Sequence, residues 1–163
     1  MRKIFGVLIL CLALIVGCSA KSDNNERQQQ NDTSLNIQEV LDQENVSPHY
    51  IETGNFTGDE LKIINTLNAS MKYSLLDDIP GIITLYSKDY PGKNDDYSDV
   101  HVLSIIVSLD SPKFNFTSDN SVEVFVDRSD IVLADPEKSI STVAKIYYMV
   151  KENGEWKISS IQN

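Results

Sequence analysis

The sequence predicts an α+β domain in which helices come first and an antiparallel sheet of about four strands follows. Three observations support this prediction. Apolar residues recur at three- and four-residue steps from Leu61 to Leu75, which is the spacing of one helix face. From Lys113 onward apolar and polar residues alternate, as they do in half-buried strands. Near the end, Asn153-Gly154 separates two such runs, and this pair favours a tight hairpin turn.

The chain begins with a segment typical of a secretion signal. Arg2 and Lys3 precede 13 positions, Ile4 to Val16, of which 12 are apolar. A helix of that length would be about 20 Å long, which is shorter than a hydrocarbon core of about 30 Å. These features indicate a cleaved signal peptide over residues 1–17 rather than a permanent membrane span.

The residues at the end of this segment, Ile15-Val16-Gly17-Cys18, resemble the lipobox of bacterial lipoproteins. The resemblance implies cleavage before Cys18, an S-diacylglycerol on its sulfur and an N-linked acyl chain such as palmitate. Each buried methylene contributes about 0.8 kcal/mol, so two or more chains hold a protein stably on a bilayer. We therefore expect a lipid-anchored protein on the extracytoplasmic face of a bacterial cell membrane. The alternative is an ordinary signal peptide in which Cys18 is incidental.

The charge of the chain excludes one class of partner. The net charge is −10, and loss of residues 1–17 with their two basic residues would make it −12. Nucleic-acid phosphates require clustered Lys and Arg, so we expect no nucleic-acid partner. Anionic head groups would also repel this chain, so the lipid must hold it at the membrane.

Residues 18–55 are expected to form a flexible tether and an approach segment. Residues 21–36 contain one aliphatic residue, Leu35, among Asn, Gln, Ser and charged residues. Such a segment buries too little apolar surface to offset its ordering entropy. The pattern over 37–41 is faintly helical, and the folded domain is expected over residues 56–163.

Two helices are expected at the start of that domain. Thr57-Gly58-Asp59-Glu60 fits a capping box, and the helix that follows should run to about Leu76. Asp77-Asp78-Ile79-Pro80 ends it, because the residue before a proline avoids the helical region. Asp78 can cap a second, shorter helix that ends before Tyr90-Pro91-Gly92.

The segment from Val100 to Leu109 is ambiguous, because its apolar residues suit both a helix and a strand. The later strands are clearer: alternation from 114 to 126, a long strand from Ser141 to Lys151 and a last strand from Trp156 to Ile161. A two-residue Asn-Gly loop pairs Met149 with Ile158 and Tyr147 with Ser160. In this register Ile161 lies on the face opposite to Met149 and Tyr147, together with Tyr148, Ile146 and Val150.

The order of these elements resembles the nuclear transport factor 2-like (SnoaL-like, cystatin-like) family. The run DDIPGIITLYSKDY at 77–90 is similar to the second helix of that family, and VKENGEWKI at 150–158 is similar to its last hairpin. The resemblance implies that residues 100–109 form a third helix. It also implies a bent, cone-shaped sheet around the first helix, a pocket at its wide end and a homodimer through the outer sheet face. Apolar residues on both faces of the last hairpin fit such a dimer.

Enzymes of this superfamily use an acid–base pair inside the cone, and no local motif here carries one. His101 is the candidate general base, although a lone histidine more often serves in packing. Tyr73, Tyr86 and Tyr147 are the candidate pocket-lining residues, with core packing as the alternative role. Two distant histidines and no free cysteine predict no metal site, and no cofactor motif occurs.

These observations favour a non-catalytic domain that binds a small ligand or an envelope protein. The alternative is a small-molecule isomerase, cyclase or hydrolase with its site in the cone pocket. A pocket that holds His101 or Asp110 within hydrogen-bond reach of a tyrosine would favour the enzyme. A third possibility is a structural accessory subunit that docks through an apolar sheet face.

Overall fold

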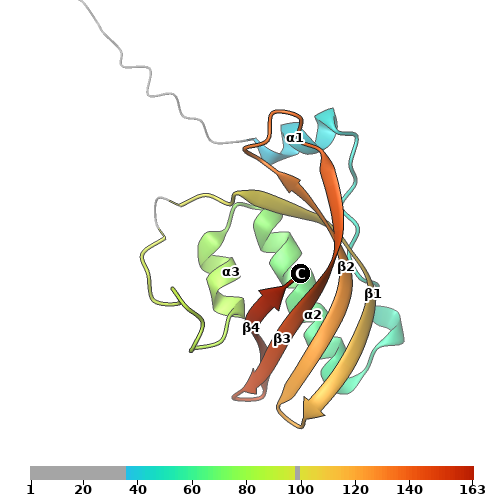
Figure 1. Cartoon of the computed structure of the whole chain (residues 1–163), viewed down its shortest axis with the longest axis vertical. Helices are drawn as coiled ribbons and strands as arrows, with labels where there is room; N and C mark the ends of the chain where they lie inside the picture. Colours follow the sequence, from blue (N-terminus) through green and yellow to red (C-terminus); the bar gives the residue numbers. More distant parts are fainter. Residues whose placement is uncertain (1–35, 98–99) are drawn as a thin grey trace, which may run out of the picture. The chain divides into compact units, whose positions relative to one another are not determined.

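The computed structural model describes residues 36–97 and 100–163. Its helices precede its strands, which form one antiparallel sheet in the order β1-β2-β3-β4, so the protein is α+β (Figure 1). The elements are α1 (Ile37–Gln43), a short 3₁₀ turn (Thr53–Asn55), α2 (Gly58–Leu75), α3 (Ile79–Leu85), β1 (Ser104–Ser118), β2 (Ser121–Val132), β3 (Ile140–Glu152) and β4 (Glu155–Gln162). No helix in these described ranges is long and apolar enough to cross a membrane.

The main core lies between α2 and one face of the sheet, which we call the inner face. Ile63, Ile64, Leu67 and Met71 of α2 are all fully buried there. They pack against alternate residues of the central strands, namely Val122, Val124, Val126, Tyr147 and Met149. The helical periodicity in the sequence therefore identified the correct face of α2.

A second core lies under α1, near the connection between β2 and β3 (Figure 1). Ile37, Val40 and Leu41 pack there with Ile105 and Val107 of β1, Ile131 of β2 and Leu133 just after β2. The folded region thus includes α1 and begins well before residue 56, where we expected the domain to start. The sequence signal was weak because this helix has only seven residues.

The segment after α1 is also held against the sheet. The backbone of His49 pairs with β1 through two hydrogen bonds. His49 N donates to the Val107 carbonyl at 2.9 Å, and Leu109 N donates to the His49 carbonyl at 3.1 Å. The Asn68 side chain of α2 bonds both backbone groups of Ile51. The approach segment is therefore part of the domain.

The prediction of a third helix over Val100–Leu109 is wrong, since β1 begins at Ser104. Ile105 and Val107 belong to the core under α1, whereas Ile106 and Leu109 belong to the main core. A strand that is covered on both faces loses the alternation of polar and apolar residues. A register shift after Ile106 blurs the period further.

The helix starts differ in how they are capped. Thr57 precedes α2, but its side chain makes no capping hydrogen bond, so the predicted capping box does not form. Asp59 instead accepts from Lys151 Nζ at 2.8 and 2.9 Å. The prediction for α3 is confirmed, because Asp78 Oδ1 accepts from the backbone N–H of Gly81 at 2.8 Å.

The last hairpin has the predicted turn but a different register at its far end. Asn153 and Gly154 both have positive φ, at 52° and 83°, as a type I′ turn requires. Met149 pairs with Ile158 as predicted, but a bulge follows and Tyr147 pairs with Ile161 instead of Ser160. Ile161 therefore faces the main core with Tyr147, and the prediction that it lies on the opposite face is wrong.

If α1 is part of the folded unit, truncating its buried leucine must lower the stability of the whole domain. Leu41→Ala should reduce the free energy of unfolding by about 2 kcal/mol or more, because it removes buried methylenes and leaves a cavity. Gln38→Ala, on the exposed side of the same helix, is the matched control and should change it by less than about 0.5 kcal/mol. Urea denaturation of the purified proteins measures both, and equal effects would contradict the assignment.

Candidate ligand-binding site

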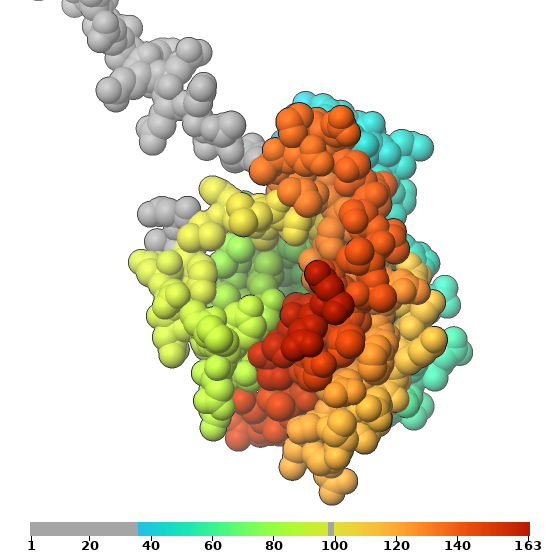
Figure 2. All heavy atoms as spheres, in the orientation of Figure 1, coloured from blue at the N-terminus to red at the C-terminus, as the bar shows by residue number. Residues whose placement is uncertain are grey.

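A small cavity lies between the inner face of the sheet and the helices α2 and α3. Its volume is about 100 Å³. Figure 2 shows the molecule hollowed on this side, where green atoms of α2 form the floor between β1, β3 and the C-terminal strand. The lining residues come from all four strands, both helices and the segment between α3 and β1: Ser70, Ser74, Ile82, Tyr86, Val102, Ser104, Ile106, Arg128, Tyr147, Ile158 and Ile161.

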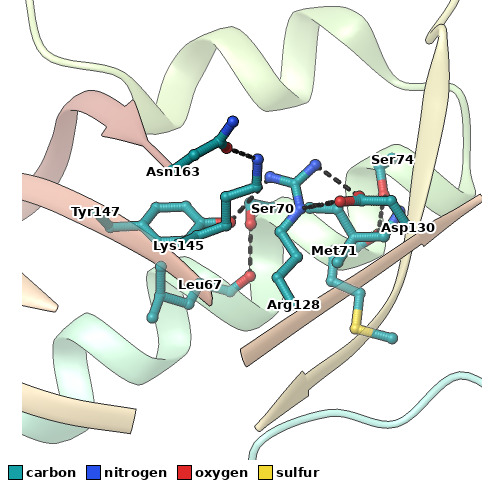
Figure 3. A network of polar contacts seen from close by, with 10 residues as sticks. Leu67, Ser70, Met71, Ser74, Arg128, Asp130, Lys145, Tyr147 and Asn163 are labelled. Carbon is teal, nitrogen blue, oxygen red and sulfur yellow. Dashed lines mark hydrogen bonds and ion pairs between the residues drawn. The ribbon is translucent and has the colours of Figure 1, made fainter. Parts of the chain in front are cut away.

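An arginine enters this cavity from the central strand β2. Side chains two residues apart on a strand lie on the same face, so Arg128 and Asp130 continue the inward-facing row of Val122, Val124 and Val126. The guanidinium lies between the Asp130 carboxylate and the Tyr147 hydroxyl (Figure 3).

The hydrogen bonds of Arg128 fix its orientation. Nε donates to both Asp130 oxygens at 2.9 Å, and Nη2 donates to Oδ1 at 2.7 Å. Nη1 donates to the Tyr147 hydroxyl at 3.0 Å. The side chains of Arg128 and Asp130 are only 15% and 14% exposed. Interactions of this charge-assisted, two-point kind are strong and directional.

The cavity favours a charged arginine and neutral tyrosines. Burial works against the charge of Arg128, but Tyr147 and Asp130 outweigh it and raise the pKa of the guanidinium. Burial raises the pKa of Tyr147, which Arg128 only partly opposes. Burial, together with Tyr90 and Tyr147, also raises the pKa of Tyr86. Both tyrosines therefore keep the proton that they can donate.

Two of the three candidate tyrosines meet in this cavity. Tyr86 and Tyr147 line it. Tyr73 does not line it and lies where α2 meets α3, since a Cβ built on Gly81 would come within 2.8 Å of Tyr73 Cδ1.

The candidate general base lies elsewhere. The His101 side chain is 67% exposed and its Nδ1 contacts the Asp77 carboxylate. The other Asp77 oxygen accepts from the Val102 N–H at 2.7 Å. His101 and Asp77 thus hold the loop before β1 and do not line the cavity.

Asp110, the other group that would have favoured an enzyme, also lies outside the cavity. Its Oδ1 is 3.3 Å from His49 Nε2, and its Oδ2 accepts from the Ser108 hydroxyl. Neither Asp110 nor His101 reaches a tyrosine of the cavity.

Arg128 and Asp130 were not among the site residues predicted from the sequence. The signal that could have found them is their phase, because they fall at even-numbered positions that continue the alternating valines of 122–126. A charged residue in phase with buried ones must be paired.

Two further predictions concern other parts of the chain. Cys18, the predicted lipidation site, lies outside the described residues. Within residues 36–97 and 100–163, no group of three or more His, Cys, Asp or Glu residues could hold a metal ion.

No protein-family model matches this chain, and no curated protein matches it in sequence.

The tyrosines of the cavity predict a loss of stability at alkaline pH. Their pKa values are raised from the ordinary 10.0, so the folded state holds protons that the unfolded state releases above about pH 10. The stabilisation is complete below about pH 10 and is lost as the pH rises toward the folded-state values. Urea denaturation at about pH 8 and pH 11 measures the loss.

Tyr86→Phe should lose less stability between these two pH values than the wild type, because one buried group no longer ionises. Tyr50→Phe, at a residue that is 39% exposed, is the matched control and should behave like the wild type. An undiminished loss in Tyr86→Phe would contradict this account.

Proposed function

We propose that this chain is an extracytoplasmic lipoprotein, anchored by acyl chains on Cys18, whose domain binds a small ligand without catalysing a reaction. The observation that carries the binding role is the cavity that holds Arg128. Its polar groups are fixed by each other, and Arg128 is held from two sides by Asp130 and Tyr147. Groups that are preorganised in this way bind and orient a ligand at low entropic cost.

The proposed family is the nuclear transport factor 2-like family, with the sheet wrapped as a cone around α2. Two features support it: helices precede a four-stranded antiparallel sheet, and α2 packs on one face of that sheet beside a cavity. In this proposal the cavity is the pocket of the cone.

A homodimer through the outer sheet face also belongs to the proposal. Phe125 is 39% exposed and pairs with Ile146 on that face. The next outward pair is Glu123 with Tyr148. An envelope protein that docks on the same apolar side chains is the other form of this proposal.

An isomerase, cyclase or hydrolase with its site in the cavity is the second candidate function. One observation favours it, because a tyrosine and an aspartate meet at Arg128, and such a pair can exchange a proton with a substrate. However, both Asp130 oxygens already accept hydrogen bonds from the guanidinium. The geometry therefore supports binding better than catalysis.

The proposed lipid anchor predicts the mass of the protein and its presence in the membrane fraction. The wild-type protein from a bacterial host should carry a diacylglyceryl group on Cys18 and fractionate with membranes, because several acyl chains insert stably. Cys18→Ser should be unmodified and leave the membrane fraction. Intact mass spectrometry and membrane partition measure both, and an unmodified wild type in the medium would refute the anchor.

The binding role predicts that filling the cavity abolishes binding. Ser70 lines the cavity and is 7% exposed, so Ser70→Leu should remove fragment binding seen by ligand-observed NMR. Ala69→Leu is the matched control, because Ala69 is the neighbouring α2 residue and lines a different groove. Equal binding by both variants would place the ligand elsewhere. Turnover of a fragment that Asp130→Asn abolishes would favour the enzyme instead.

A further inference from the structure

Arg128 has hydrogen-bond donors to spare. A guanidinium carries five N–H groups, and its hydrogen bonds to described residues use three of them, one each from Nε, Nη1 and Nη2. One N–H therefore remains on each of the two terminal nitrogens. Two adjacent N–H groups of this kind match the two oxygens of a carboxylate.

One tyrosine adds a donor at the same place. Tyr147 accepts from Arg128, so its own proton is directed to another acceptor. Tyr86 also lines the cavity, but its hydroxyl is engaged by the Tyr90 side chain. Ser70 and Ser74 contribute no donor, because their hydroxyls already donate to the Leu67 and Met71 carbonyls at 2.7 and 2.8 Å (Figure 3). Arg128 and Tyr147 therefore supply donors to the cavity, and a ligand that complements them carries acceptors.

The local charge is opposite to that of the whole chain. Arg128 is the one charged residue among the described residues that line the cavity. Lys145 lies on the same inner face, opposite Val126 in the sheet register, and its Nζ contacts Asn163 (Figure 3). Two anions lie nearby: Asp130 accepts from Arg128, and Asp77 accepts from the Val102 N–H and contacts His101. Neither lines the cavity, so the charged side chain that faces a ligand there is a cation, in a protein of net charge −10.

The size and the walls of the cavity indicate the rest of the ligand. The cavity has a volume of about 100 Å³, several times the roughly 10–15 Å³ that holds one water molecule on this measure. Five of its lining residues are aliphatic, namely Ile82, Val102, Ile106, Ile158 and Ile161. A carboxylate with a short aliphatic chain matches this size and these walls.

We infer that the ligand is a short aliphatic carboxylate, held end-on by the two spare N–H groups of Arg128 and by the hydroxyl of Tyr147. This inference rests on the proposed binding function and names its ligand class. A free short-chain acid and the C-terminal carboxylate of a peptide share this chemistry.

The test compares each acid with its uncharged amide on the intact purified protein. Butyrate should shift the backbone amide resonances of Ser70, Ser74 and Ser104 and the side-chain resonances of Arg128 in ¹⁵N NMR titrations. Butyramide has a similar shape without the charge and should bind at least about tenfold more weakly. The dipeptide Ala-Val and its C-terminal amide, titrated in the same way, distinguish a peptide end from a free acid.

Variants then assign the contact to Arg128. Arg128→Lys keeps the charge but loses the paired donors, so butyrate should bind at least about tenfold more weakly. Tyr147→Phe keeps the ring, removes one donor and should weaken butyrate less. Lys62→Met, which removes a cation from a different groove, is the control for net charge and should leave the affinity unchanged. If Arg128→Lys does not fold, the comparison of butyrate with butyramide and the Tyr147→Phe titration still decide the question.

The outcomes separate this inference from the proposed function. Equal affinity for butyrate and butyramide, or full butyrate affinity in folded Arg128→Lys, would overturn the inference that the ligand is a carboxylate. If uncharged fragments bind in the cavity while no carboxylate does, the inference fails and the binding function stands. If no probe and no fragment shifts the cavity resonances, both fail.

Discussion

The alternation of side chains along β2 is the constraint on which the inner face depends. β2 lies between β1 and β3, so the side chains of its inner face have neighbours on both sides. Three valines place the core under α2, and the same phase then brings Arg128 and Asp130 inward. A register shift by one residue would move every side chain of the strand to the other face. One register of β2 therefore determines both the apolar core and the polar cavity.

The buried pair of Arg128 and Asp130 matters more for geometry than for stability. Attraction between two buried charges is largely offset by the loss of their hydration. Three hydrogen bonds from two nitrogens nevertheless leave the guanidinium little rotational freedom. Tyr147 accepts a hydrogen bond on the other side of the guanidinium. Arg128 therefore has few rotamers left to lose when a ligand binds.

Local signals in the sequence predicted the elements that local signals control. The helix α2, the Asp78 cap of α3 and the Asn153-Gly154 turn each depend on residues close together in the chain, and each occurs as predicted. β1 and α1 depend on partners far away. The pattern of residues 100–109 was therefore ambiguous between helix and strand, and the faintly helical residues 37–41 were assigned to the tether and approach segment. Two cavity tyrosines were found by residue type. Arg128 was missed because the consecutive apolar residues Ile131, Val132 and Leu133 hide the alternation that the valines of 122–126 begin.

The bulge in the last hairpin decides which face of the sheet Ile161 occupies. Between the pairs Met149–Ile158 and Tyr148–Ser160, Ser159 has no partner, and its hydroxyl donates to the Tyr148 carbonyl at 2.9 Å. If all residues of β4 were paired without a bulge, Ser160 would lie opposite Tyr147 and Ile161 would turn to the outer face. The one extra residue therefore keeps Ile161 in the cavity wall, while most side-chain replacements at Ser159 would leave the faces of β4 as they are.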